Sequence, residues 1–543
     1  MTAIEHFEVP HLALWKSCVS EILAKEYKQT KNTSYGIDID HSMIKATDKY
    51  CKLINTNKPL IDPGKDSNDK EAVEVYLSYL HHRMAHAKIA KQKDSETKLK
   101  SQIAEYKFGN PLWQKMFIQY YKYYWQYPYH KGVTPKYRSW QADDAGKGNI
   151  EYSVINWTLP SNARIAIVGD IGTGTDEASA VISAACKFKP DAILHLGDIY
   201  FSGTKQETNK RLVGMVRKVL KKERLEIPFF TVPGNHEYFT GAVSFLNALD
   251  SDKLIYDKTQ KQEASYFCLR SQDNGWQFLG LDTGYNGHYM NVSQGAKEAT
   301  LKYLHIGAIE NPKPDGNKYW PKDHNPYFLN SSEANLPQKD TTSPVAMVTV
   351  RPDEELWHVD KLSKFSGRSV LLSHHQLYSA LDVCGIAQAN LPSSNNPDLI
   401  DINRIWMNTG LWKQFGPYFG DKVAAWIWGH EHNLVIFEDN YLPAGLPTNK
   451  AFTDVYKTLP KGRCAGHSAI PVQDSEEPYK INYQVPFRQD LKLDLTKVGN
   501  ENWYNHGFQI IELFGAGNPA RLSYFQVSLK DSIALPLFVE TIN

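Results

Sequence analysis

Residues 423–438 read VAAWIWGHEHNLVIFE. In this stretch an apolar run is followed by two histidines placed two positions apart. On an extended chain alternate residues point to the same face, so the imidazoles of His430 and His432 would share one side. Neutral imidazole is the commonest transition-metal ligand among protein side chains. The pair indicates a metal site if other parts of the chain supply further ligands.

Four other apolar runs also end in side chains that bind hard or borderline metals. In chain order the residues that follow these runs are Asp170, Asp198, Asn235 with His236 and Glu237, and His374 with His375. In open α/β sheets, catalytic groups gather outside the carboxyl ends of the strands. If these strands lie side by side, we expect all five endings to converge on one edge of the sheet.

The ligand types indicate a binuclear centre. Asp, Asn and His without Cys favour Fe, Mn or Zn, as divalent or mixed-valence ions. The ligands are too many for one tetrahedral ion, but they fit two ions about 3.5–4 Å apart that share a carboxylate. Such a pair acidifies and orients a bridging water and neutralises a phosphate under in-line attack. The predicted chemistry is hydrolysis of a phosphoester.

Each motif taken alone has an ordinary explanation. An Asp after a strand often caps the next helix, and an Asn is a common turn residue. A pair of adjacent histidines is more often hydrogen-bonded in the interior than catalytic. Because five such endings would have to coincide in one chain, we favour the metal site.

The elements that must position these residues begin near residue 163. Short apolar runs alternate there with helix-like segments: ARIAIVG, DEASAVISAACKF, DAILHLG, NKRLVGMVRKVLKKE and PFFTVPG. This alternation predicts an α/β fold with a mostly parallel sheet covered on both faces. Further strands are expected at SYFCLR, WQFLGLDTG, RSVLLSHH, VAAWIWGH and NLVIFE, with GFQIIELFG and ARLSYFQVSL as a closing pair. His195 lies inside one of these runs and is expected to be a core or subunit-facing residue.

Residues 1–150 are predicted to be an α-helical N-terminal region ending in a linker, and 151–543 a catalytic domain. The segment 71–106 carries apolar residues at helical spacing among Lys and Glu. His81, His82 and His86 on this helix are expected on a solvated face. The tyrosine-rich block at 119–129 is expected to dock the helices on the catalytic domain, with a stacking surface for bases or sugars as the alternative.

Composition limits the other possibilities. The chain is 42% hydrophobic and 22% charged, with a net charge of +1, so electrostatics give no general reason to expect nucleic acid. The N-terminus lacks the basic and apolar regions of a signal peptide, and no run is long enough to cross a bilayer. We therefore expect a cytoplasmic protein without a membrane span. Segments near 285–350 and 385–402 are expected to be long surface insertions.

The order of the motifs resembles that of the calcineurin-like metallophosphoesterases. The motifs are GDIG (169–172), GDIY (197–200), GNHE (234–237), LLSH (371–374) and GHEH (429–432). The Gly after the first Asp, where most relatives carry His, is similar to the purple acid phosphatase branch. The resemblance covers roughly residues 160–440 and the closing strands, and implies a four-layer αββα sandwich. It says nothing about residues 1–150.

The resemblance also implies ligand roles. Asp198 would be the carboxylate shared by both metals. Asp170 and His432 would bind the first metal. The ligands of the second metal would be Asn235, His374 and His430.

Three further residues would act beside the metals. His236 would contact the phosphate or assist the leaving group, and Glu237 would orient it by a hydrogen bond. His375 could face substrate, although the roles of His374 and His375 could be exchanged.

The tyrosine near the bridging carboxylate departs from the family pattern. Purple acid phosphatases place a ligating Tyr three residues after that Asp, whereas here the position is Phe201 and the tyrosine is Tyr200. A one-residue deletion in the loop could still deliver Tyr200 to the first metal. Otherwise the first site has neither Tyr nor the usual His and would be rich in water.

These features predict a metal-dependent phosphoesterase. The expected reaction is hydrolysis of a phosphomonoester or phosphodiester, small or macromolecular, by attack of a metal-bridging hydroxide. The alternative is a binding or scaffold protein that keeps a degenerate metal site. The sequence leaves the substrate, the metal pair and the oligomeric state open.

Overall fold

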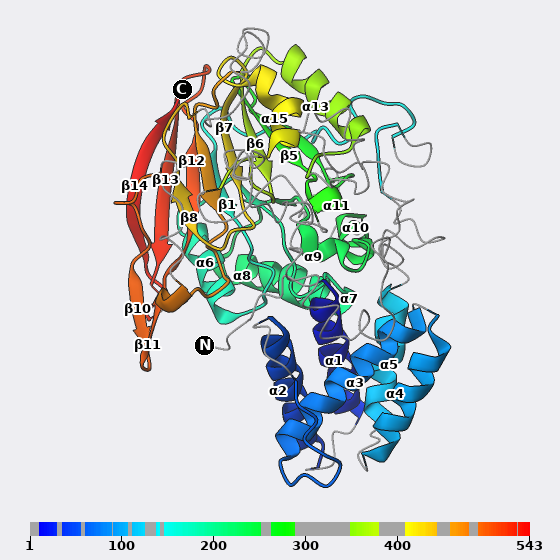
Figure 1. The fold of residues 1–543 in the computed structure, drawn as a ribbon. Coiled ribbons are helices and arrows are strands. Elements are labelled where there is room, and N and C mark those ends of the chain that lie inside the picture. The colour runs from blue at the N-terminus through cyan, green and yellow to red at the C-terminus, as the bar shows by residue number, and fades with distance from the viewer. Residues whose placement is uncertain are drawn as a thin grey trace, which may run out of the picture.

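The computed structural model describes residues 10–29, 35–55, 60–89, 91–106, 111–124, 137–141, 146–250, 262–287, 348–379, 408–441, 457–476, 487–528 and 530–543. Figure 1 shows two sheets with their helices in one part of the molecule and a group of N-terminal helices beside them. No helix among these residues is long and apolar enough to span a membrane. Most of the insertion expected at 285–350, and all of the one at 385–402, lie outside the described residues.

The first sheet has the strand order β14-β13-β12-β1-β2-β3. Its strands are β1 (Arg164–Val168), β2 (Ala192–His195), β3 (Phe229–Thr231), β12 (His506–Glu512), β13 (Ala520–Val527) and β14 (Ala534–Ile542). β1, β2 and β3 are parallel, and β12 joins β1 antiparallel. β12 and β13 are the two strands expected to close the chain. β14 follows them and pairs with β13, so the sheet ends at β14.

The second sheet has the order β4-β5-β6-β7-β9-β8. Its strands are β4 (Phe267–Arg270), β5 (Trp276–Leu281), β6 (Arg368–Ser373), β7 (Val423–Trp428), β8 (Leu434–Ile436) and β9 (Gly462–Ala465). β5, β6, β7 and β9 run parallel. A separate hairpin consists of β10 (Leu495–Val498) and β11 (Glu501–Tyr504).

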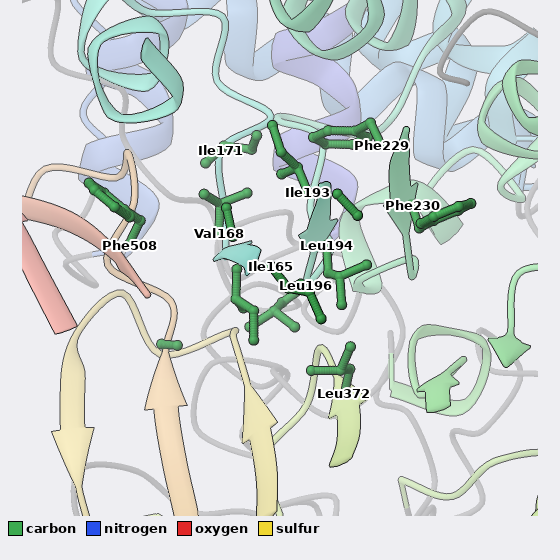
Figure 2. Packing of buried hydrophobic residues seen from close by; sticks show 14 of the residues in the cluster. Ile165, Val168, Ile171, Ile193, Leu194, Leu196, Phe229, Phe230, Leu372 and Phe508 are labelled. Carbon is green, nitrogen blue, oxygen red and sulfur yellow. The ribbon is translucent and has the colours of Figure 1, made fainter. Parts of the chain in front are cut away.

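The two sheets pack face to face, and helices cover their outer faces. Figure 2 shows Leu372 of β6 in the same buried cluster as Ile165, Leu194 and Leu196 around the first sheet. α6 (Asp176–Cys186) packs on β1, β12 and β13 and against α8 (Met215–Glu223). On the other side α13 (Pro352–Lys364) and α15 (Thr409–Phe415) share a buried cluster with the second sheet. The fold is therefore α/β, a four-layer αββα sandwich with an N-terminal helical region.

Short helices occupy the connections. They are α7 (Lys205–Glu207), η1 (Thr208–Gly214), α9 (Asn235–Tyr238), α10 (Val243–Asp250), α11 (Gly284–Gly287), η4 (Gly416–Tyr418) and η5 (Asp474–Glu476). α9 is the most important of these for the site, because it begins directly after β3 at the predicted ligand Asn235.

The N-terminal helices have their own buried core. They are α1 (Pro10–Gln29), α2 (Tyr35–Asn55), α3 (Lys70–Ile89), α4 (Lys93–Glu105) and α5 (Pro111–Tyr124). Trp15 and Trp113 stack at its centre, with ring centroids 6.1 Å apart. This core also includes Tyr200 and Phe201 of the loop after β2, so the helices and the sandwich share a buried cluster.

Two expectations about this region are wrong in detail. His81, His82 and His86 are 3%, 0% and 9% exposed, not solvated, because α3 is packed against α2, α4 and α5 and has no open face. In the tyrosine-rich block, Tyr120 and Tyr123 are buried against α1 and α3 within the helices. Residues 125–129 of the expected block lie outside the described residues. α1 contacts the sandwich through Lys16 and Ser17.

Candidate metal centre

The predicted ligands converge where the carboxyl ends of the two sheets meet. In the first sheet Val168 pairs with His195, so the loops carrying Asp170 and Asp198 leave side by side. In the second, Ser373 pairs with Trp428, which aligns the endings of β6 and β7. The expectation that all five strand endings lie on one edge of a single sheet is therefore wrong. The apolar pattern of a parallel strand does not reveal which strands share a sheet. The backbone N–H of His430 joins the two edges by donating to Asp170 Oδ2 at 3.1 Å.

Three of the predicted ligands have strained backbones. Asp170, Asp198 and His430 have φ values of 57°, 73° and 69°, in the left-handed region that residues with a Cβ rarely adopt. Such strain persists only where surrounding structure enforces it, and it clusters at functional sites. Each residue stands at the first turn after a buried strand, where this backbone conformation places it among the other predicted ligands.

Close approach explains the glycine of GNHE. A Cβ at Gly234 would overlap Asp198 Oδ1 and lie 2.9 Å from Cδ2 of His374. Only glycine lets the start of α9 approach the carboxylate so closely, and this places Asn235 beside His374.

His374 is the hub of one group of donors. Its Nε2 lies 3.0 Å from Asn235 Oδ1, 3.1 Å from His430 Nδ1 and 3.3 Å from Asp198 Oδ2. Its Nδ1 lies 3.0 Å from the carbonyl oxygen of Leu196 and donates its proton there. In the neutral ring that hydrogen bond fixes the tautomer, so Nε2 would present its lone pair to the other donors, as in metal-binding histidines.

Asp170, Tyr200 and His432 form a second group. The Tyr200 hydroxyl donates to Asp170 Oδ1 at 2.9 Å and lies 2.9 Å from His432 Nε2. His432 Nε2 is 3.6 Å from Asp170 Oδ1. The loop after β2 thus places the hydroxyl of Tyr200, two residues after Asp198, between Asp170 and His432.

Asp198 connects the two groups. Its Oδ1 accepts from the backbone N–H of His236 at 3.2 Å. Its Oδ2 is fully buried and has no well-oriented hydrogen-bond partner among the described residues, although it faces His374. A buried carboxylate oxygen without a partner costs free energy unless a cation completes its surroundings.

His236 is oriented by a backbone atom. Its Nδ1 lies 2.6 Å from the carbonyl oxygen of Phe201, and its Nε2 lies 3.8 Å from Asp198 Oδ2. The carboxylate of Glu237 accepts instead from the backbone N–H of Gly234 at 3.1 Å, closing the first turn of α9. The orienting partner of His236 described by the structure is therefore Phe201, not Glu237 as the sequence led us to expect.

His375 faces the same cluster from the other side. Its ring centroid is 4.6 Å from that of His430. Its backbone N–H and its Nδ1 both contact Thr283 Oγ1, at 3.0 and 3.1 Å. Thr283 follows β5 in the run WQFLGLDTG, so the strand-end rule could have identified it. The carbonyl groups of Leu196 and Phe201 carry no side-chain signal that a sequence could show.

Burial and close charges shift the pKa values of the groups at the site. Burial and the neighbouring carboxylate of Asp198 raise the pKa of Asp170 to about 7. Burial would lower the pKa of His374, but the carboxylates of Asp198 and Asp170 raise it to about 9. Burial raises the pKa of Tyr200 well above its ordinary value, which keeps the phenol protonated as a donor to Asp170.

The donor set fits transition-metal ions. Asp170, Asp198 and His374 have potential ligand atoms that all lie within 4.8 Å of one another, as do those of His374, His375 and His430. Oxygen and imidazole donors without thiolate suit Zn, Mn or Fe. Every side chain predicted to act at the site lies in or beside these groups. The individual roles of these residues stay predictions.

Comparison with known proteins agrees with this geometry. The model of the calcineurin-like phosphoesterase family matches residues 163–434. No curated protein matches the chain. Among solved structures, GAP50, titled the anchor in the inner membrane complex of Plasmodium, aligns over 70% of this chain and 89% of its own at 13% identity, with a TM-score of 0.35. That likeness is too low to inform fold or function. With half of its length matched by the family model, and the motif residues gathered at one site, the chain belongs to the calcineurin-like phosphoesterase family.

Proposed function

We propose that this chain is a metal-dependent phosphoesterase that hydrolyses a phosphomonoester or phosphodiester at a binuclear centre. The observation that carries the proposal is the position of Asp198. Its buried Oδ2 faces the donor group of His374, while Asp170 follows the adjacent strand β1 and accepts a hydrogen bond from Tyr200, which lies in the same loop as Asp198. A carboxylate shared between two donor groups is the arrangement that two ions about 3.5–4 Å apart require.

The donor groups divide between the two ions. Asp170, Tyr200 and His432 would hold one ion, and Asn235, His374 and His430 the other, with Asp198 shared. Two ions bound there would supply Lewis-acid polarisation of a phosphoryl oxygen and an acidified water. The strained backbones of Asp170, Asp198 and His430 hold the donors in place, so little reorganisation is needed at each turnover.

His236 would act on the substrate side. Because Nδ1 donates to the Phe201 carbonyl, Nε2 can donate a proton only when the ring is an imidazolium. Burial lowers the pKa of His236, so the ring is neutral in the free protein. An anionic phosphate beside Nε2 would stabilise the protonated form, which could then donate to the leaving oxygen. His375, held by Thr283, would border the same space.

The test is hydrolysis of a chromogenic phosphomonoester and its matching diester by the metal-loaded chain. Asn235→Ala removes one donor beside His374 and is expected to abolish turnover. Asn209→Ala, on the exposed side of η1, is the matched control and is expected to retain it. The ratio of monoester to diester rates assigns the substrate class. Folded, loaded protein that turns over neither ester with Mn, Fe or Zn would favour a binding protein with a degenerate site.

A further inference from the structure

A second cluster of polar aromatic side chains lies inside the N-terminal helices. We call it the His82 cluster, made of His11 on α1, Tyr50 on α2, His82 and His86 on α3, and Tyr120 on α5. His82 Nε2 and His86 Nε2 are 3.2 Å apart, and the Tyr120 hydroxyl is 3.0 Å from His86 Nε2. His11 Nδ1 lies 2.9 Å from that hydroxyl, and Tyr50 OH lies 2.9 Å from His82 Nδ1.

One nitrogen of this arrangement is shared between two neighbours. An imidazole nitrogen offers one proton or one lone pair in the plane of the ring. His86 Nε2 faces both His82 Nε2 and the Tyr120 hydroxyl, so it cannot make a full hydrogen bond to each. A cation between the three atoms would use the lone pairs of both nitrogens and of the phenol oxygen together.

The spacings are those of metal ligands. Nitrogen donors about 2.0–2.1 Å from a tetrahedral zinc ion lie about 3.3 Å from one another. The separation of His82 Nε2 and His86 Nε2, 3.2 Å, is close to this, and the expected ligands His374 and His430 are separated by a similar 3.1 Å. His82 and His86 are four residues apart on α3, the spacing that places two side chains on one face of a helix.

The surroundings keep the donors available. Burial lowers the pKa of both His82 and His86 well below the ordinary value, so both rings are neutral, as metal ligands must be. The contact of Tyr50 OH with His82 Nδ1 leaves Nε2 as the ligand atom. His11 Nδ1 is placed to take the proton that Tyr120 would release on binding a cation.

We propose that His82, His86 and Tyr120 form a further metal site, which binds one borderline divalent cation such as Zn²⁺ independently of the phosphoesterase centre. The site would tie α3 to α5, with His11 of α1 against the phenol. Because α1 also contacts the sandwich through Ser17 and Glu207, the ion would stabilise the helices that border the loop of Tyr200.

The test counts zinc bound to the full-length, tag-free chain after loading and removal of excess ion. His82→Gln and His86→Gln are each expected to lose one zinc per chain relative to wild type, and Tyr120→Phe to weaken binding there by about tenfold or more. His81→Gln is the matched control, since His81 is buried on the same helix but bonds its own backbone at Leu77. Its zinc content should equal that of wild type. Circular dichroism checks that each variant is folded.

A second measurement decides the matter if the variants do not fold. Crystals of the wild-type chain loaded with zinc should show an anomalous difference peak at the zinc edge, within bonding distance of His82 Nε2 and His86 Nε2. Absence of that peak in crystals whose catalytic centre is occupied would overturn the proposal. An unchanged zinc count in folded His86→Gln would overturn it equally.

Discussion

Replacing Glu207 with Gln should destabilise the loop that carries Tyr200. Glu207 is buried, and its Oε1 accepts from Phe201 N at 2.8 Å and from Ser17 Oγ at 2.9 Å. Its Oε2 accepts from the backbone N–H groups of Ser202 and Thr204, both at 3.1 Å. One carboxylate therefore holds the loop between Asp198 and α7, and joins it to α1.

The magnitude follows from the number of donors left without a partner. In Glu207→Gln one oxygen becomes an NH₂ group, so the two donors that shared it lose their acceptor. At about 1.5–3 kcal/mol for each hydrogen bond to a charged group, the free energy of unfolding should fall by about 3–6 kcal/mol. Ser17→Ala removes only one donor and should cost about 1–2 kcal/mol.

The assay is urea unfolding, followed by tryptophan fluorescence, of wild type, both variants and Glu226→Gln. Glu226 is exposed, and its replacement should change the free energy of unfolding by less than about 0.5 kcal/mol. The proposed phosphoesterase activity should fall as well, because the same loop presents the Phe201 carbonyl to His236. A free energy of unfolding for Glu207→Gln within about 1 kcal/mol of wild type would show that Glu207 does not hold this loop in place.

Three other perturbations have defined outcomes. Tyr200→Phe removes the hydroxyl that donates to Asp170, and calorimetric titration with Mn²⁺ should show weaker binding of one ion and unchanged binding of the other. Two unchanged affinities would show that Tyr200 is not a metal ligand. Gly234→Ala places a Cβ against the Asp198 carboxylate, and the same titration should show metal affinity lowered by about tenfold or more. An affinity equal to that of wild type would contradict the close approach of the Gly234 backbone to Asp198. Burial raises the pKa of Glu354 from 4.5 to about 8, so the folded chain keeps a proton that the unfolded chain releases, and this stability is lost as pH rises between those values. In Glu354→Gln the free energy of unfolding should fall less steeply with pH over that range, by up to about 1.4 kcal/mol per pH unit. Urea unfolding at several pH values measures this slope, and a slope equal to that of wild type would show that Glu354 does not titrate there.

The sequence was informative where local pattern and position coincide. Apolar runs ending in Asp, Asn or His correctly marked β1, β2, β3, β6 and β7, because a buried strand needs continuous apolar residues and its end can carry ligands. The four layers followed from the family resemblance. Sheet membership did not follow, since the same parallel pattern serves both sheets.

Other features depend on tertiary contacts that no local pattern encodes. The backbone carbonyl of Phe201, not the neighbouring Glu237, orients His236. His82 and His86 are buried because α3 is enclosed by other helices, although its many charges suggested a solvated face. Tyr200 reaches Asp170 through the path of a loop, which spacing from Asp198 alone left undecided.

The most direct test of the central claim is an anomalous difference map at the manganese edge from crystals of the manganese-loaded chain. We expect two peaks about 3.5–4 Å apart, both within bonding distance of Asp198. One peak should contact Asp170 and His432, and the other Asn235, His374 and His430. A single peak, or two peaks that do not share Asp198, would contradict a binuclear phosphoesterase centre.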